Sequence, residues 1–415
     1  MLRKSRSLAR SGKMTAMPRL LTLLLTLSLL AAACGDDSEA NPPVEETTSS
    51  ATLRMTTSTT QPELPEIGLL GRGEYTVGVT TVVLVDEARE RPLTVDVWFP
   101  LAEGAEGDLH QYSFITGDSF ESPLALDADA ADLSADGPFP LVVYSHGSGG
   151  VRFIHSNYTE TIASHGYVVI APDHTGNTAV ERITETSDDG AVIAVNRPLD
   201  VSSILDDFLD PANELTAPYH AAIDVESIAL TGHSFGGFTA YATVAGFESE
   251  AGDVPADDRI DAIIPLAPAV GSGGEDGLLS DEALARVGVP ALVIVGTDDK
   301  TTPVDPNVNR AWEQSSSAPH YRLELIAGEH QSFTDLCDYM VGFEDPDRPE
   351  VTPIVRETVE ALAVEGCSPG DMAIERVQEL TNTFAVTFLD SVFGDAVMFT
   401  PDAFVIPDDI IYQAK

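Results

Sequence analysis

The stretch SIALTGHSFGG at residues 227–237 decides the fold of this chain. Its first residues, SIALT, form a short apolar run typical of a buried β-strand, and the chain continues from Phe238 as an apolar helix. Between the two, Ser234 occupies the middle of a Gly-x-Ser-x-Gly pattern whose small residues permit a tight turn. A serine on such a corner is held in a strained backbone conformation with its hydroxyl exposed above the sheet. We therefore predict that Ser234 is a nucleophile; the alternative is a Gly-rich turn with a structural role only.

Further apolar runs bounded by Gly or Pro indicate a parallel sheet. They lie at residues 140–144, 167–171, 262–266, 290–295 and 321–326. Continuous runs of this kind are typical of strands that helices bury on both faces. Helical patterns occur at residues 158–164, 199–209, 238–247, 281–287 and 371–392.

Two alternating runs, at residues 75–85 and 93–99, predict an antiparallel hairpin ahead of this sheet. The sequence as a whole predicts one α/β domain over residues 72–415. Its sheet is expected to be doubly wound and mostly parallel, with helices on both faces. The segment 178–217 is expected to be an insertion that could line the mouth of the site.

A serine nucleophile needs a neutral imidazole to take its proton and a carboxylate to orient that imidazole. His330 follows the run 321–326, at the strand end where Ser234 is also expected, whereas His320 precedes that run. His330 is therefore the predicted base. The acid should follow the run 290–295, and there the residues alone leave Asp298 and Asp299 both plausible.

Backbone N–H groups usually stabilise the oxyanion that forms during acyl transfer. Phe235, the residue after the nucleophile, is expected to supply one donor. Ser148, in the loop SHGSGG after the run 140–144, is expected to supply the other. This loop does not fit a dinucleotide-binding motif, because Arg152 stands where the last glycine would be required.

The segments SHGSGG, ASHGYVVIAPDHTGNT, NRPLDVSSILDDFL and GHSFGG together resemble secreted α/β-hydrolases related to platelet-activating-factor acetylhydrolases and dienelactone hydrolases. The resemblance covers residues 74–393 and implies the α/β-hydrolase fold and a cofactor-free carboxylic ester hydrolase. It also implies a triad of Ser234, Asp299 and His330, since the pattern of a glycine, two residues, an aspartate and a proline four residues on selects Asp299. Ser234 departs from dienelactone hydrolases, which use cysteine, and Ser148 departs from acetylhydrolases, which carry an apolar residue there.

The substrate expected from this resemblance is a short or medium acyl ester, with acetyl or acyl esters of phospholipids among the candidates. A cutinase-like polyester hydrolase is an alternative, although such enzymes usually carry methionine at the position of Phe235 and an aromatic residue at that of Ser148. An alternative of another class is a non-catalytic, lipid-anchored binding protein on a hydrolase fold.

The chain is strongly acidic, with 22 Lys and Arg against 67 Asp and Glu and a net charge of -45. Nucleic acids and anionic membrane surfaces would repel it, so neither is an expected partner. The expected partner is a small ester or lipid, and the expected state is a monomer. No zinc-binding spacing occurs, and in the acidic stretch 126–137 Ala131 stands where a calcium loop needs a ligand, so no metal is predicted and that stretch is expected to be a solvated loop.

Residues 1–34 are predicted to be a signal peptide, because a basic segment is followed by a short apolar run and small residues before Cys34. The end resembles a bacterial lipobox, which implies that Cys34 is lipidated and anchors the exported protein at the outer face of a membrane; a plain secretory peptide is the alternative. Residues 35–71 are predicted to be a disordered tether rich in Ser, Thr and Pro. Cys337 and Cys367 then remain as one pair for a disulfide, or as two buried thiols.

Overall fold

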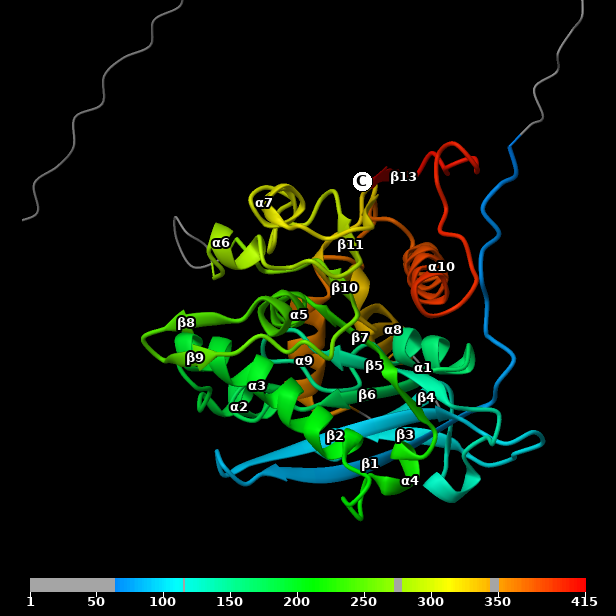
Figure 1. Ribbon diagram of the computed structural model, residues 1–415, viewed down its shortest axis with the longest axis vertical. Coiled ribbons are helices and arrows are strands. Elements are labelled where there is room, and N and C mark those ends of the chain that lie inside the picture. Colours follow the sequence, from blue (N-terminus) through cyan, green and yellow to red (C-terminus); the bar gives the residue numbers. More distant parts are fainter. Residues whose placement is uncertain (1–63, 115, 272–277, 344–350) are drawn as a thin grey trace, which may run out of the picture. The chain divides into compact units, whose positions relative to one another are not determined.

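An eleven-stranded β-sheet forms the centre of the chain (Figure 1). The computed structural model describes residues 64–114, 116–271, 278–343 and 351–415. The predicted signal peptide, Cys34 and most of the predicted tether therefore lie outside the described residues. No helix in the described part is long and apolar enough to cross a membrane.

Six parallel strands form the middle of this sheet. In spatial order they are β6 (Val168–Pro172), β5 (Phe139–Ser145), β7 (Ile223–His233), β10 (Ala262–Leu266), β11 (Ala291–Gly296) and β12 (His320–Leu325). Each overlaps one of the apolar runs predicted as strands. Because parallel strands end at the same edge of a sheet, the loops that follow them meet there.

The remaining strands extend the sheet on both sides. They are β1 (Val77–Asp86), β2 (Arg91–Pro100), β3 (Leu109–Ser113), β4 (Ser119–Asp127) and β13 (Ile410–Ala414), with β8 (Phe247–Ser249) and β9 (Gly252–Val254) forming a separate two-stranded sheet. The predicted hairpin of β1 and β2 is confirmed, and β2 pairs antiparallel with β6. The sequence analysis missed β3, because only one of its residues is buried and the apolar pattern is correspondingly weak.

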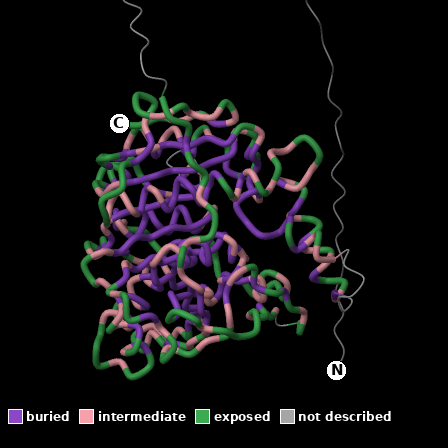
Figure 2. The backbone as a smooth tube through the Cα atoms, turned by 90° about the vertical axis from the view of Figure 1, so that its right-hand side faces the viewer, coloured by how far each residue is buried: buried purple, intermediate pink, exposed green. Residues whose placement is uncertain are grey.

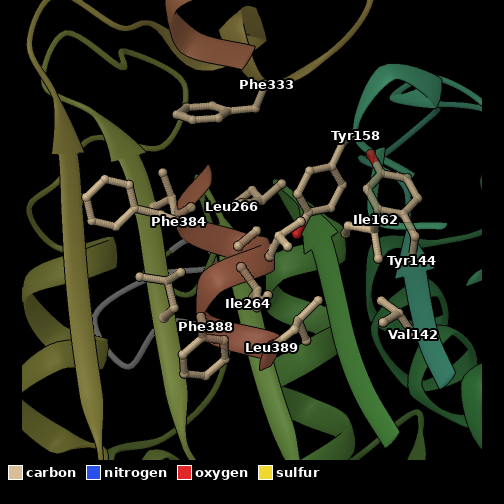
Figure 3. Close-up of a cluster of buried hydrophobic side chains, with 14 of the residues drawn as sticks. Val142, Tyr144, Tyr158, Ile162, Ile264, Leu266, Phe333, Phe384, Phe388 and Leu389 are labelled. Carbon is tan, nitrogen blue, oxygen red and sulfur yellow. The ribbon is translucent and has the colours of Figure 1, made fainter. Parts of the chain in front are cut away.

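Helices cover both faces of the sheet, as predicted. They are α1 (Ser156–Ser164), α2 (Ala179–Thr184), α3 (Gly190–Leu209), α4 (Ala217–His220), α5 (Phe235–Ala245), α6 (Asp281–Leu284), α7 (Asn307–Gln314), α8 (Leu336–Phe343), α9 (Pro353–Leu362) and α10 (Ile374–Phe393), with 3-10 turns at Ala130–Asp132 and His330–Phe333. α1 and α10 pack on one face together with Val142 and Tyr144 of β5 (Figure 3). α3 and α5 pack on the other face together with Leu141 and Val143.

This alternation explains why the central strands are apolar throughout. Successive side chains of a strand point to opposite faces, and here both faces are covered. Figure 2 shows the consequence, with buried backbone running through the interior and exposed backbone at the periphery.

The segment 178–217 differs from its prediction. Half of it is α3, which begins at Gly190, earlier than the predicted helix 199–209. Val201, Ile204 and Leu205 of α3 are fully buried. An insertion at the mouth of a site would leave such side chains exposed, so the prediction is wrong for α3. Only α2 remains as a candidate for the mouth.

Two other predicted boundaries also change. The tether does not reach residue 71, because Ile67 is buried and the N–H of Leu70 donates to Thr383 Oγ1 at 2.9 Å. The acidic stretch 126–137 is only partly a loop, since it begins inside β4 and then forms the turn Ala130–Asp132. Among the described residues, no group of three or more His, Cys, Asp or Glu could hold a metal ion.

A disulfide joins Cys337 in α8 to Cys367, the pair expected from the sequence. The enclosed chain includes α9, which packs on α8 through Val355, Val359 and Tyr339. We call these two helices the α8–α9 pair. Their apolar cluster is much smaller than the two large clusters of the sheet and meets one of them through the partly buried Phe114 and Ile154. The covalent link therefore adds to the limited packing of this pair.

We expect replacement of both Cys337 and Cys367 by serine to lower the free energy of unfolding by about 3.5 kcal/mol, the loop-closure value for a separation near 30 residues. For a domain of this size that corresponds to a fall in Tm of about 5 °C, which calorimetry of the unreduced proteins measures. A reductant should lower the Tm of the wild type and leave that of the double variant unchanged. Equal Tm values for the two unreduced proteins would contradict the prediction.

Candidate active site

Ser234 lies on a sharp corner between β7, which ends at His233, and α5, which begins at Phe235. Its backbone has φ 58° and ψ -115°, a left-handed conformation that costs a non-glycine residue about 1–3 kcal/mol. Two backbone hydrogen bonds hold it there, from Ser234 N–H to the Leu266 carbonyl at 2.8 Å and from Ala269 N–H to the Ser234 carbonyl at 3.1 Å. The surrounding chain therefore stabilises the strained corner.

The two glycines of the Gly-x-Ser-x-Gly pattern are required by close contact with β5. A Cβ atom on Gly236 would lie 1.8 Å from the carbonyl oxygen of Ser145, and one on Gly232 would lie 2.4 Å from the same oxygen. No side chain fits at these separations. The glycines thus allow the end of β5, and the loop after it, to approach Ser234.

The structure brings Ser234, His330 and Asp299 together in one line of hydrogen bonds. His330 Nε2 lies 2.9 Å from Ser234 Oγ, and His330 Nδ1 lies 2.8 Å from Asp299 Oδ2. Asp299 follows β11 and His330 follows β12, so all three residues come from the carboxyl ends of parallel strands. With Nδ1–H donated to the carboxylate, Nε2 is left to accept the proton of Ser234.

The geometry distinguishes the two aspartates that the sequence left open. Asp299 is 4% exposed and accepts hydrogen bonds from both Thr302 N–H, at 2.6 Å, and Thr302 Oγ1, at 2.8 Å. Asp298 is exposed and accepts a hydrogen bond from its neighbour Thr297. Asp299, and not Asp298, therefore faces His330.

His233 and Thr302 support the site, and the sequence analysis assigned neither of them this part. Burial lowers the pKa of His233 well below its usual value, so its ring is neutral. Its Nε2 lies 2.9 Å from the carbonyl oxygen of His330 and donates to it, which fixes the backbone of the predicted base. His320, the histidine set aside, lies at the start of β12 against Trp312, away from Ser234.

The loop 145–150 lies beside the nucleophile. A Cβ atom on Gly147 would be 3.5 Å from Ser234 Cβ, so the backbone of this loop passes directly over the corner. Among the described residues, neither Ser148 N–H nor Phe235 N–H has a hydrogen-bond partner. Both predicted donors are therefore available to a negatively charged oxygen near Ser234.

A cavity of about 270 Å³ opens onto Ser234 and His330. Most of its lining is apolar and comes from the loop after β5, from the turn after β3 and from the α8–α9 pair. These side chains are Phe114, Val151, Ile154, Leu336, Tyr339, Val359 and Leu362. α2 contributes Ala179 and Arg182, so this short part of segment 178–217 does line the mouth as predicted. The arrangement suits a compact apolar group placed against a serine hydroxyl.

Parts of the chain are similar to known proteins. The sequence model of a family described as platelet-activating factor acetylhydrolase, isoform II, matches residues 83–197. A curated protein of Schizosaccharomyces pombe, described as "Putative phospholipase A2", is 31% identical over 112 residues, which cover 25% of this chain and 26% of that protein. The chain thus spans about a quarter of the length of this curated relative. Both matches concern sequence, and the family match ends before Ser234.

A solved structure extends the comparison to most of the chain. The ferulic acid esterase from Streptomyces cinnamoneus superposes with a TM-score of 0.61 and 22% identity, covering 85% of this chain and all of the other. At this identity the likeness shows the fold. The resemblance expected from the sequence is therefore confirmed: the chain has the α/β-hydrolase fold, and part of it is similar to platelet-activating factor acetylhydrolases and to a putative phospholipase A2.

Proposed function

We propose that this protein is a serine carboxylic ester hydrolase in which Ser234, His330 and Asp299 act as the catalytic triad. The observation that carries the proposal is the unbroken line of hydrogen bonds from Ser234 Oγ through His330 to Asp299, beside an apolar cavity. A hydrogen-bonded arrangement of serine, histidine and aspartate activates a serine hydroxyl toward an acyl carbon.

In the proposed mechanism, His330 Nε2 takes the proton of Ser234 as Oγ attacks the ester carbonyl. The N–H groups of Ser148 and Phe235 donate to the oxyanion of the tetrahedral intermediate. His330 then protonates the leaving alcohol, and an acyl-enzyme remains on Ser234. Water, deprotonated by His330, attacks this acyl group and releases the acid and the free serine.

The size of the cavity supports a short or medium acyl group. At about 270 Å³ it is near the lower end of ligand-binding pockets, and most of its lining is apolar. The described relatives act on esters of different kinds according to their names, so phospholipid and ferulic acid esters are both candidate substrates.

A hydrolysis panel distinguishes these substrates and the polyester alternative. It contains p-nitrophenyl esters of rising chain length, an acetylated phospholipid, methyl ferulate and an insoluble polyester film. We expect the highest kcat/KM on short or medium p-nitrophenyl esters and little release from the film. Hydrolysis of the film at a rate similar to that of the soluble esters would favour the cutinase-like alternative.

We also propose that the protein is exported and lipid-anchored through Cys34, and that it is a monomer. Detergent phase partition of the native protein and of a Cys34→Ser variant tests the anchor. Only the wild type should enter the detergent phase. The non-catalytic binding protein remains the alternative of another class, and it requires that no ester of the panel is turned over.

Ser234→Ala is expected to lower kcat by at least about 10³-fold, because it removes the nucleophile and leaves only the oxyanion donors and binding. A fluorophosphonate probe should label the wild type and fail to label the variant. Circular dichroism provides the control that both are folded. More than about a tenth of wild-type turnover in the variant would remove Ser234 from the proposed role.

Asp299→Asn should lower kcat by up to about 10⁴-fold, because an amide no longer holds the imidazole in the tautomer that accepts the serine proton. Asp298→Asn is the matched control, one residue away and exposed, and it should change kcat little. Steady-state kinetics on one p-nitrophenyl ester compares the two. The reverse ranking would transfer the role of the acid to Asp298.

A further inference from the structure

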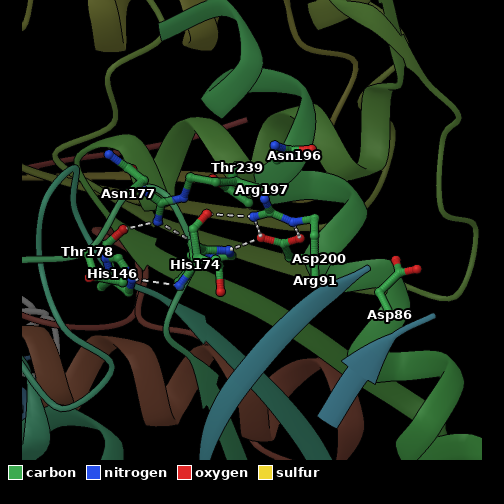
Figure 4. Close-up of polar contacts among 12 residues, drawn as sticks. Asp86, Arg91, His146, His174, Asn177, Thr178, Asn196, Arg197, Asp200 and Thr239 are labelled. Carbon is green, nitrogen blue, oxygen red and sulfur yellow. Dashed lines mark hydrogen bonds and ion pairs between the residues drawn. The ribbon is translucent and has the colours of Figure 1, made fainter. Parts of the chain in front are cut away.

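Arg197 of α3 lies fully buried behind the loop 145–150 (Figure 4). Its Nη2 donates to Ser145 Oγ at 2.9 Å and also to the carbonyl oxygen of His146. Its Nη1 donates to Asn177 Oδ1 at 2.9 Å. One guanidinium therefore joins the end of β5, the loop after it and the loop after β6.

The partners of Arg197 are themselves fixed. Asp200 accepts from Arg91 at 3.0 Å and from His174 Nδ1 at 3.1 Å, which leaves His174 Nε2 to accept from Ser145 Oγ at 3.0 Å. Burial lowers the pKa of His174 to about 4, so the ring is neutral and Nε2 is an acceptor. The oxygen of Ser145 is then oriented to accept from Arg197.

A contribution to the stability of the fold does not explain why an arginine occupies this buried position. In the described part of the chain it has no direct ion pair, and its Nε is buried without a hydrogen-bond partner. Burial lowers the pKa of Arg197 to about 9, which shows how unfavourable the site is for a cation. A buried charge with incomplete partners destabilises a fold relative to an apolar side chain of similar volume.

The contacts of Arg197 converge on the two proposed oxyanion donors. The acceptor at His146 is on the chain that leads into Ser148, and Asn177 also donates from Nδ2 to Ser148 Oγ at 3.1 Å. On the other side, the guanidinium lies 5.3 Å from the ring centre of Phe235, a cation–π contact. The N–H groups of Ser148 and Phe235 come from separate loops, and Arg197 contacts the surroundings of both.

We propose that Arg197 is a positioning residue that sets the two N–H donors of the oxyanion hole relative to each other. The inference rests on the proposed ester hydrolysis, because it concerns the transition state of that reaction. Donors must be close to the position that the oxyanion will occupy, so a small shift of one loop weakens transition-state binding more than substrate binding.

The test compares Arg197→Lys and Arg197→Met with the wild type. Lysine can donate to some of the acceptors, although it lacks the planar guanidinium group of arginine. It should therefore preserve more activity than methionine, which donates to none of them. We expect kcat to fall about 10-fold or more for lysine and about 10²–10³-fold for methionine, the range known for losing one oxyanion donor, with KM little changed. Affinity for a trifluoromethyl ketone, whose serine adduct places an oxyanion in the hole, should fall in parallel with kcat.

Arg322→Lys is the matched control for a buried arginine. Arg322 is 7% exposed, forms an ion pair with Glu324, also has a buried Nε without a partner, and lies on β12, separated from β5 by three strands of the sheet. Arg322→Lys should lower the Tm about as much as Arg197→Lys does, and it should leave kcat unchanged. Ser145→Ala, which deletes one acceptor of Arg197 and retains the cation, gives a milder second variant if Arg197→Met does not fold.

The possible outcomes distinguish failure of the proposed ester hydrolysis from failure of the proposed role of Arg197. If the wild type turns over no ester and reacts with no fluorophosphonate, the proposed function fails. If the wild type is active, and both Arg197→Lys and Ser145→Ala keep kcat and ketone affinity within about twofold, the positioning role is overturned and Arg197 is structural only. A parallel loss of kcat and ketone affinity at constant KM, absent in Arg322→Lys, supports it.

Discussion

The close approach of the end of β5 to the corner at Ser234 is the contact on which the site depends. The Ser145 carbonyl occupies space that a side chain at Gly232 or Gly236 would need. This approach places the loop 145–150 over the serine, where its backbone N–H groups can reach an oxyanion. The positive φ of Ser234 at this corner is held by the backbone hydrogen bonds to Leu266 and Ala269.

The proposed base, His330, and the proposed acid, Asp299, are brought to this corner by the parallel sheet. β7, β11 and β12 run in the same direction, so the residues that follow them share one edge although they are far apart in the sequence. His233 links two of these strand ends directly by donating to the carbonyl of His330. Strand direction and strand order thus bring the residues of the proposed triad together, and side-chain hydrogen bonds then orient their side chains.

Ser234 has polar surroundings on one side and apolar surroundings on the other. Behind the loop 145–150 lies the buried network of Arg197, His174 and Asp200, which restricts the backbone. In front lies the apolar cavity, which is lined in part by the α8–α9 pair that the disulfide links. The family match at residues 83–197 contains the loop, His174 and Arg197, and it ends before Asp200 and the α8–α9 pair. The pair is therefore the part of the site about which this family match says nothing.

The sequence by itself determined the parallel strands, the helices on both faces and the corner at Ser234, because these depend on local apolar patterns and on glycine. It also indicated His330, since only one histidine follows the right strand. The choice of Asp299 needed a family pattern in the sequence and is explained in the structure by burial and Thr302, which no local pattern reveals. Arg197, the core position of α3 and the contact of residues 66–70 with the domain were decided only by tertiary structure. A buried arginine is indistinguishable from a surface one in sequence, because its partners come from strands and loops that meet only when the sheet has formed.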